Sequence, residues 1–157
     1  MEDTPETGNG LNAGADAVLV EAPRRGARKP DIVEVVLVDD SVPVRERVAA
    51  SLAALDGVEV VGQAGDVPSG LRLLEEREPD VLILDLELPG QSGLDLLKIA
   101  KRRGYASVII MFSIHDHPKL REKCAELGAA FYFNKNSEFE LASEVCRKLA
   151  MQRRRQG

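Results

Sequence analysis

The chain has 157 residues, a length that fits one domain with short extensions. Its formal net charge of −5 argues against a general nucleic-acid-binding protein, and we expect no direct DNA binding. No apolar run is long enough to span a bilayer, so we expect no membrane association. The two cysteines, Cys124 and Cys146, fall in helical patterns, which is typical of reduced core thiols in a cytoplasmic protein.

Residues 1–31 are rich in Gly, Ala, Pro and charged residues and show no sustained hydrophobic period. Such a composition buries too little apolar surface to order the chain, so it predicts a disordered N-terminal extension and linker. Two interpretations stay open for this segment: an inert tail and a docking arm for a partner.

From residue 32 onward, short apolar runs alternate with helical patterns. The expected strands are residues 32–38, 58–64, 81–86, 107–113 and 129–133. A helix is expected after each strand, and the helix after the third strand is expected over residues 93–102. Apolar residues at helical spacing predict the other four helices: Val44, Val48, Leu52 and Leu55; Val67, Leu71 and Leu74; Leu120, Cys124 and Leu127; Leu141, Val145 and Leu149.

Five strand–helix units with short connections predict an α/β protein with a doubly wound, five-stranded parallel sheet. Runs as apolar as residues 32–38 are typical of strands buried on both faces. The units span residues 32–151, and residues 152–157 are expected to form a basic C-terminal tail.

Polar residues stand where the predicted strands end. Asp39 and Asp40 follow the first strand, Asp85 the third, Ser113 the fourth and Lys135 the fifth. Because ligands of such sheets bind beyond the carboxyl ends of the strands, these five side chains are expected to meet at one edge.

Three adjacent carboxylates raise one another's pKa unless a cation compensates them, and hard oxygen ligands suit Mg²⁺. A carboxylate nucleophile, a divalent cation, the Ser113 hydroxyl and the Lys135 ammonium together fit phosphoryl transfer onto a carboxylate. Each residue alone has a simpler explanation, since aspartates often cap helices and a lone lysine is usually a solvated charge.

Together these residues resemble the receiver domain of two-component response regulators, over about residues 32–151. The resemblance implies a flavodoxin-like fold and makes Asp85 the residue phosphorylated by a histidine kinase or a phosphotransfer protein. It implies that Asp40 binds Mg²⁺ directly, that Asp39 assists, and that the backbone carbonyl of Glu87 completes the protein ligands.

The same resemblance implies a switch. Ser113 would be the switch hydroxyl, Lys135 the lysine that pairs with the phosphoryl group, and Tyr132 the switch aromatic, although an aromatic in a last strand is also often simple packing. Pro89 and Gly93 match the turn after the phosphorylated residue. A downstream protein would bind the face formed by the fourth helix, the fifth strand and the fifth helix.

Several positions depart from the family's common pattern. Asn136 stands where a proline often follows the lysine, and we expect Ser137 to cap the last helix instead. Glu87 and His115 match positions that tune dephosphorylation, with a sign that the sequence leaves open. No output domain follows Lys135, so the resemblance implies a stand-alone receiver that promotes only its own phosphorylation and dephosphorylation.

Two alternatives of other classes remain. The first is a constitutive interaction module of the same fold that never uses phosphate, which an intact acidic cluster disfavours. The second is a phosphatase of the haloacid-dehalogenase type, which carries a second acid two residues after its nucleophile, as Glu87 follows Asp85. Its nucleophile, however, follows the first strand of the fold, whereas Asp85 follows the third.

Overall fold

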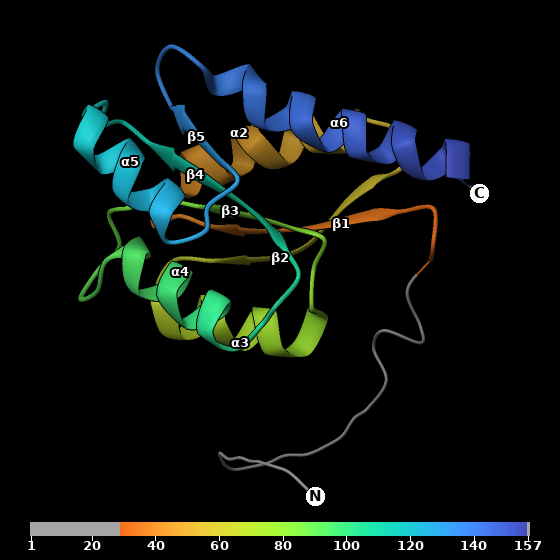
Figure 1. The fold of residues 1–157 in the computed structure, drawn as a ribbon. Coiled ribbons are helices and arrows are strands. Elements are labelled where there is room, and N and C mark those ends of the chain that lie inside the picture. Colours follow the sequence, from red (N-terminus) through yellow and green to blue (C-terminus); the bar gives the residue numbers. More distant parts are fainter. Residues whose placement is uncertain (1–28, 157) are drawn as a thin grey trace, which may run out of the picture.

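The computed structural model describes residues 29–156, which form a five-stranded sheet covered by helices on both faces (Figure 1). The predicted N-terminal extension, residues 1–31, lies almost wholly outside the described residues. Neighbouring strands pair in parallel in the order β2-β1-β3-β4-β5. The predicted doubly wound parallel sheet is therefore confirmed.

The five strands form where the apolar runs predict them. They are β1 (Val33–Val38), β2 (Val58–Ala64), β3 (Val81–Leu84), β4 (Val108–Ser113) and β5 (Phe131–Asn134). Every residue of β1 and β3 is buried, because both strands lie inside the sheet with helices above and below. The fifth strand begins two residues later than expected and includes Asn134.

The helices are α2 (Val42–Ala53), α3 (Val67–Arg77), α4 (Gly93–Arg102), α5 (Pro118–Glu126) and α6 (Phe139–Gln156). Side chains cap four of their amino ends: Ser41 for α2, Asp66 for α3, Ser92 for α4 and His117 for α5 each accept a backbone N–H of the first turn. Since α6 extends to Gln156, the residues expected to form a basic tail are helical as far as the structure describes them.

Ser137 does not cap α6 in the way we expected. The turn before this helix is organised by Asn134, whose side-chain oxygen accepts the N–H groups of Asn136 and Ser137 at 2.8 and 3.0 Å. Asn134 and its Asx turn thus replace the predicted serine cap, since an Asn side chain mimics a backbone turn.

Two hydrophobic cores enclose the sheet. On one face, Val36 and Val38 of β1 pack with side chains of α3 and α4 and with Cys124 of α5. On the other face, Val33, Val35 and Leu37 pack against α2 and α6. Figure 1 shows the same division, with α2 and α6 on one side of the sheet and α3 and α4 on the other.

The order in which successive strands are added to the sheet reverses between β1 and β3. From β1 the sheet extends to β2 on one side, and from β3 it extends through β4 to β5 on the other. The carboxyl ends of β1 and β3 therefore flank the topological switch point, where open α/β sheets bind ligands. Within residues 29–156, no helix is both long enough and apolar enough to cross a membrane.

Candidate phosphorylation and metal site

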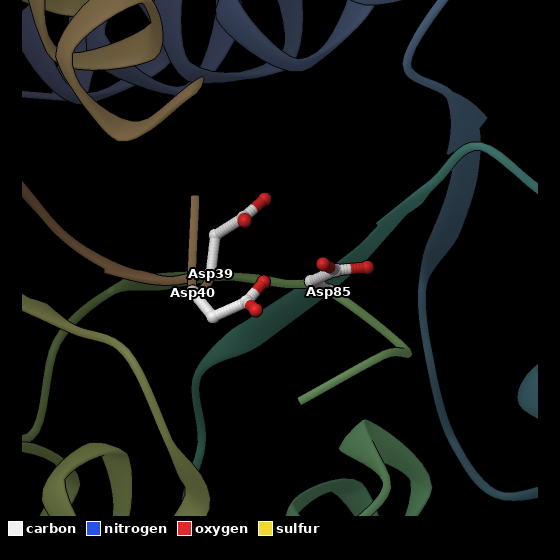
Figure 2. Close-up of side chains that lie close together, drawn as sticks. All are labelled: Asp39, Asp40 and Asp85. Atoms are coloured by element: carbon white, nitrogen blue, oxygen red, sulfur yellow. The ribbon is translucent and has the colours of Figure 1, made fainter. Parts of the chain in front are cut away.

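Three aspartates meet at this switch point. Asp39 and Asp40 follow β1 and Asp85 follows β3, and each offers a carboxylate oxygen within 4.8 Å of the others (Figure 2). Asp39 and Asp85 are buried, whereas Asp40 is exposed. The structure thus brings together the three acids that the sequence placed at one edge of the sheet.

The start of α2 fixes the position of Asp39. The backbone N–H of Ser41 donates to Asp39 Oδ1 at 2.9 Å, and the Ser41 hydroxyl accepts the Val44 N–H at 3.3 Å. The guanidinium of Arg45 donates to the backbone carbonyl of Asp39. The carboxylate is therefore held by the helix start, and its remaining oxygen, Oδ2, pairs with the ammonium of Lys135.

Lys135 binds two of the acids directly. Its ammonium nitrogen lies 2.5 Å from Asp39 Oδ2 and 3.0 Å from Asp85 Oδ2, and its side chain is about 10% exposed. Burial alone would lower the pKa of Lys135, but the hydrogen bonds and charges of Asp39 and Asp85 outweigh it and raise that pKa above its ordinary value. The lysine therefore stays charged in the cleft.

Asp85 is held in a fixed orientation and has a perturbed pKa. Its Oδ1 accepts the Glu87 N–H at 3.2 Å while its Oδ2 accepts Lys135. Burial raises the pKa of the Asp85 carboxyl, with Asp39 adding to the shift, while Lys135 and the Glu87 N–H oppose it. One lysine compensates three acids only in part, so the site retains a demand for positive charge.

The loop after Asp85 approaches its backbone closely. The Gly93 N–H donates to the Leu86 carbonyl at 2.8 Å, and a Cβ on Gly93 would lie 2.0 Å from the Asp85 carbonyl oxygen. Only glycine fits at this position. Gly93, which was noted in the sequence, therefore allows α4 to begin directly against the backbone of Asp85.

A cleft at this edge is lined by the three acids, Lys135, Glu87, Pro89 and Ile114. Beside it, His115 Nε2 lies 2.9 Å from Glu87 Oε2, which joins the loops after β3 and β4. Both side chains are about half exposed. The contact connects two positions that the sequence had singled out separately.

Ser113 ends β4 and is fully buried. Its hydroxyl accepts the His115 N–H at 3.1 Å, and its carbonyl accepts the Lys135 N–H at 2.9 Å. Tyr132 of β5 is 9% exposed, and its hydroxyl donates to the His115 carbonyl at 2.7 Å. The two residues expected to act as switches are thus linked through the backbone of His115.

The donor set fits Mg²⁺. The three clustered groups are carboxylates, which are the ligands this ion prefers, and the exposed Asp40 gives access for an ion that keeps several waters. No thiol or imidazole belongs to the cluster, which argues against a site built for zinc.

Two arginines near these residues were not predicted from the sequence. Arg45 holds the Asp39 backbone, and Arg121 contacts the backbone of Tyr132 at 2.8 Å. Arg121 lies far in sequence from the partners it contacts in β5 and beyond, so no local motif marks it. For Arg45, its position in the first turns of the helix that follows the paired aspartates was the only available signal.

Comparison with known proteins identifies the family. The model of the response regulator receiver domain matches residues 35–146. The nitrate/nitrite response regulator protein NarP of Escherichia coli is 36% identical over 115 residues, which are 73% of this chain and 53% of NarP. A protein-glutamate methylesterase/protein-glutamine glutaminase of Koribacter versatilis is 37% identical over 108 residues, which are 68% of this chain and 30% of that protein.

Among solved structures, the signal receiver domain of the putative response regulator NarL from Mycobacterium tuberculosis superposes with a TM-score of 0.71 at 30% identity. That match covers 78% of this chain and 98% of the NarL domain. The chain spans between about a third and a half of the length of the curated relatives named above. With a family model that covers most of the chain and a fold that agrees with it, the chain belongs to the receiver domains of two-component response regulators.

Proposed function

We propose that this chain is a phosphorylation-dependent switch, in which Asp85 accepts a phosphoryl group from a histidine kinase or a phosphotransfer protein. The observation that carries the proposal is the single cleft in which Asp39, Asp40, Asp85 and Lys135 meet. A buried carboxylate with a raised pKa, beside a fixed ammonium, is typical of a functional site.

In the proposed step, a carboxylate oxygen of Asp85 attacks the phosphorus of a phosphohistidine. A P–O bond forms to Asp85, the P–N bond breaks, and the imidazole leaves with the bonding electron pair and takes up a proton from solvent. Lys135, already 3.0 Å from Asp85 Oδ2, is placed to pair with the oxygens of the transferred group. The Glu87 N–H keeps the carboxylate oriented during the attack.

Mg²⁺ is the proposed cofactor. Asp40 and Asp85 would bind the ion directly, Asp39 would assist, and the backbone carbonyl of Glu87 would complete the protein ligands. When bound, the ion neutralises negative charge on the transferring phosphoryl group. The three clustered carboxylates support this assignment, because one lysine does not balance them.

The proposed output is a change of surface. Ser113 is the hydroxyl that would move toward the phosphoryl group, and Tyr132 is the aromatic coupled to it through the His115 backbone. The face affected is formed by α5, β5 and α6, which we propose binds a downstream protein. The phosphoryl group supplies the energy through contacts that differ between the two states. We propose no turnover of other substrates.

The test is intact-mass analysis after incubation with Mg²⁺ and acetyl phosphate. The wild type should gain one phosphoryl mass, and Asp85→Asn or chelation of Mg²⁺ should prevent the gain. Asp31→Asn is the matched control, because Asp31 is exposed and lies outside the acidic cluster, and it should be modified like the wild type.

Beryllofluoride, which binds such sites without covalent chemistry, provides the second readout. If a folded wild type neither gains mass nor binds beryllofluoride in the presence of Mg²⁺, the phosphorylation function is excluded. The phosphate-independent interaction module would then be the better description of the chain.

A further inference from the structure

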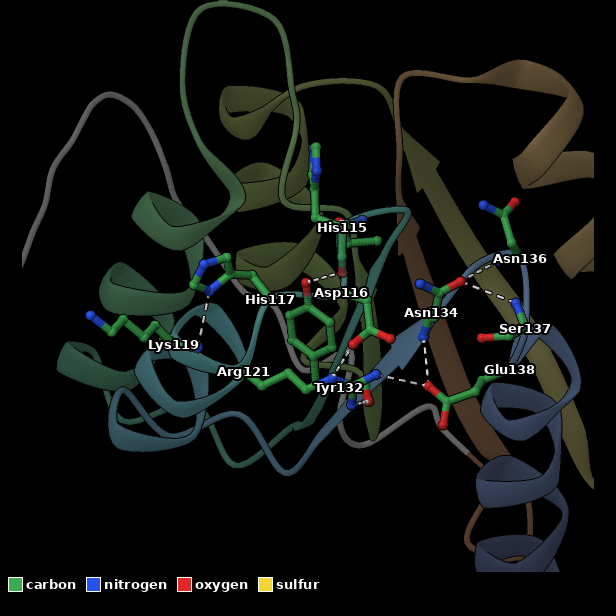
Figure 3. A network of polar contacts seen from close by, with 11 residues as sticks. His115, Asp116, His117, Lys119, Arg121, Tyr132, Asn134, Asn136, Ser137 and Glu138 are labelled. Carbon is green, nitrogen blue, oxygen red and sulfur yellow. Dashed lines mark hydrogen bonds and ion pairs between the residues drawn. The ribbon is translucent and has the colours of Figure 1, made fainter.

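Arg121 of α5 joins three segments of the face formed by α5, β5 and α6 (Figure 3). Its Nε donates to Asp116 Oδ1 in the loop after β4 at 2.8 Å, and its Nη1 donates to the Tyr132 carbonyl of β5 at 2.8 Å. Its Nη2 donates to Glu138 Oε1, just before α6, at 3.0 Å. One guanidinium therefore holds the loop, the strand and the turn together.

The same guanidinium holds the Tyr132 side chain. Its central carbon lies 4.7 Å from the centre of the Tyr132 ring, within the range of a cation–π contact. At its other end, the Tyr132 hydroxyl donates to the His115 carbonyl at 2.7 Å. Tyr132 is thus held at the face of its ring, at its backbone carbonyl and at its hydroxyl, and only 9% of the residue is exposed.

Contacts of Glu138 extend the network to the cleft. Its Oε1 also accepts the Asn134 N–H at 2.9 Å, and the Asn134 side chain caps the turn that follows. Lys135 lies between Asn134 and Glu138 in the sequence. Its backbone N–H donates to the Ser113 carbonyl, and its ammonium pairs with Asp39 and Asp85. The segment that Arg121 restrains is therefore the segment that carries the cleft lysine.

Tyr132 is buried while Asp85 is engaged as a carboxylate. Asp85 Oδ2 pairs directly with Lys135 Nζ at 3.0 Å, which is the pairing of the unmodified acid. Arg121 and the His115 carbonyl hold Tyr132, and the Ser113 side chain also interacts with its hydroxyl; Asp85 and the Lys135 ammonium are not among these groups. Arg121 therefore contributes to the buried position of the ring through contacts that involve neither Asp85 nor Lys135.

We propose that Arg121 is a positioning residue that fixes Tyr132 in its buried place before phosphorylation, so that the α5–β5–α6 face is preset for its partner. The inference rests on the proposed function in one respect, that Tyr132 reports the state of this face. It deepens that function by assigning part of the switch energy to a side chain outside the cleft. Basal binding to the partner then depends on Arg121, and phosphorylation adds to a state that is already favoured.

The geometry of the Arg121 guanidinium explains how one side chain can hold Tyr132 in its buried position. A single exposed ion pair contributes little, and the Arg121 side chain is one-third exposed. Here, however, a planar fork makes three hydrogen bonds to three segments while its face covers an aromatic ring. An ammonium at the same place is a point charge that reaches fewer of these partners, so Arg121→Lys should restore the effect only in part.

The test follows Tyr132 by fluorine NMR. The chain has two tyrosines, so 3-fluorotyrosine labelling in a Tyr105→Phe background leaves Tyr132 as the only labelled site. Burial of the ring is read from the solvent isotope shift between H₂O and D₂O, first without additions and then with Mg²⁺ and beryllofluoride. Thermal melts by circular dichroism confirm that each variant is folded.

In the parent background, Tyr132 should show a buried resonance without additions and change little when beryllofluoride binds. Arg121→Gln should lower the ratio of buried to exposed ring about fivefold, and beryllofluoride should then restore the buried resonance. Arg121→Lys should fall between the two. The matched control is Arg147→Gln, because Arg147 pairs with Glu144 within α6 and has no contact with Tyr132, and its spectrum should equal that of the parent.

An unchanged Tyr132 resonance in folded Arg121→Gln overturns the proposal. It is also overturned if the parent moves from exposed to buried on adding beryllofluoride as far as the variant does. Failure of the proposed function looks different: no variant responds to beryllofluoride and acetyl phosphate adds no mass. The comparison without additions still decides the role of Arg121 in that case.

Discussion

The two ends of the sheet use aspartate in opposite ways. At the amino ends of the strands, Asp80 is 10% exposed, pairs with Arg153 at 2.5 Å and accepts the Glu34 N–H at 2.8 Å. At the carboxyl ends, Asp39, Asp40 and Asp85 crowd together around one lysine. The first end pairs the Asp80 carboxylate with Arg153, whereas the second brings three carboxylates together, and a bound cation can relieve their repulsion.

The basic residues near the C-terminus belong to the first arrangement. Arg153 also donates to the Ile32 carbonyl at 2.8 Å, and Arg154 donates to the Asp56 carbonyl at 3.1 Å. These contacts fasten the end of α6 to the start of the sheet. The difference between the two ends teaches that aspartates of similar burial have different roles, which their partners determine.

The largest expected effect concerns the close approach at the crowded end. Gly93→Ala should lower the free energy of unfolding by about 3 kcal/mol, because its Cβ would meet backbone atoms of Asp85, which have no free rotation to move away. Phosphorylation by acetyl phosphate should fall as well, since Asp85 must shift. Urea denaturation followed by circular dichroism measures the first effect, and intact mass measures the second.

Gly90→Ala is the matched control for this substitution. Gly90 has a φ of +78°, and a Cβ added to it would have no neighbour within 4 Å, so alanine there costs only backbone strain of about 1 kcal/mol. Equal losses for the two variants would contradict the role of close contact at Gly93.

Next in size is the loss of the paired aspartate. Asp80→Asn should destabilise the fold by about 2 kcal/mol, because an amide removes the charge that holds Arg153. The amide NH₂ group would also face an N–H donor, either of Arg153 or of the Glu34 backbone, where the carboxylate now accepts a hydrogen bond. Asp56→Asn, at an exposed position, should change stability by less than about 0.5 kcal/mol. A neutral result at Asp80 would remove the contrast between the two ends.

The same substitution at the crowded end should have the opposite sign. Asp85→Asn should stabilise the metal-free protein by about 1 kcal/mol at neutral pH, since it removes a buried charge while Lys135 keeps its pairing with Asp39. Because the pKa of Asp85 is raised in the folded state, the wild type loses stability as the pH rises from the unfolded value toward the folded one. The stability difference between the variant and the wild type therefore reaches its full size above the pKa that Asp85 has in the folded protein.

Urea denaturation at several pH values, with a chelator present, tests this sign. The difference between Asp85→Asn and the wild type should vanish as the pH falls below the unfolded value of about 4, where the carboxyl is protonated in both states. A variant that is less stable than the wild type at neutral pH would show that the Lys135 pair outweighs the crowding.

Sequence patterns predicted the arrangement of strands and helices and the composition of the acidic cluster for one physical reason. Buried parallel strands read as continuous apolar runs, and the residue after each run must lie at the carboxyl edge, as Asp39 and Asp85 do. The same logic places Lys135 after β5.

The contacts made by arginines escaped prediction because they depend on three-dimensional side-chain geometry. Arg121 meets Tyr132 and Glu138 only after α5 and β5 have packed, and Arg153 meets Asp80 across most of the domain. Boundaries were missed for a related reason. The turn before α6 is set by Asn134, which accepts two N–H groups, and the sequence alone does not distinguish this Asx turn from a cap at Ser137.

The smallest expected change in stability is at Asp40, and it separates charge crowding from metal binding. Since Asp40 is exposed, Asp40→Asn should alter the metal-free free energy of unfolding by less than about 0.5 kcal/mol. Saturating Mg²⁺, a hundredfold above its dissociation constant, should stabilise the wild type by about 2.7 kcal/mol and the variant far less. Glu87→Gln is the control, because the proposed ligand there is a backbone carbonyl and the Mg²⁺ response should persist. If Asp40→Asn responds to Mg²⁺ like the wild type, the ion is not held by this aspartate, and the crowded end would have to relieve its charge through Lys135 alone.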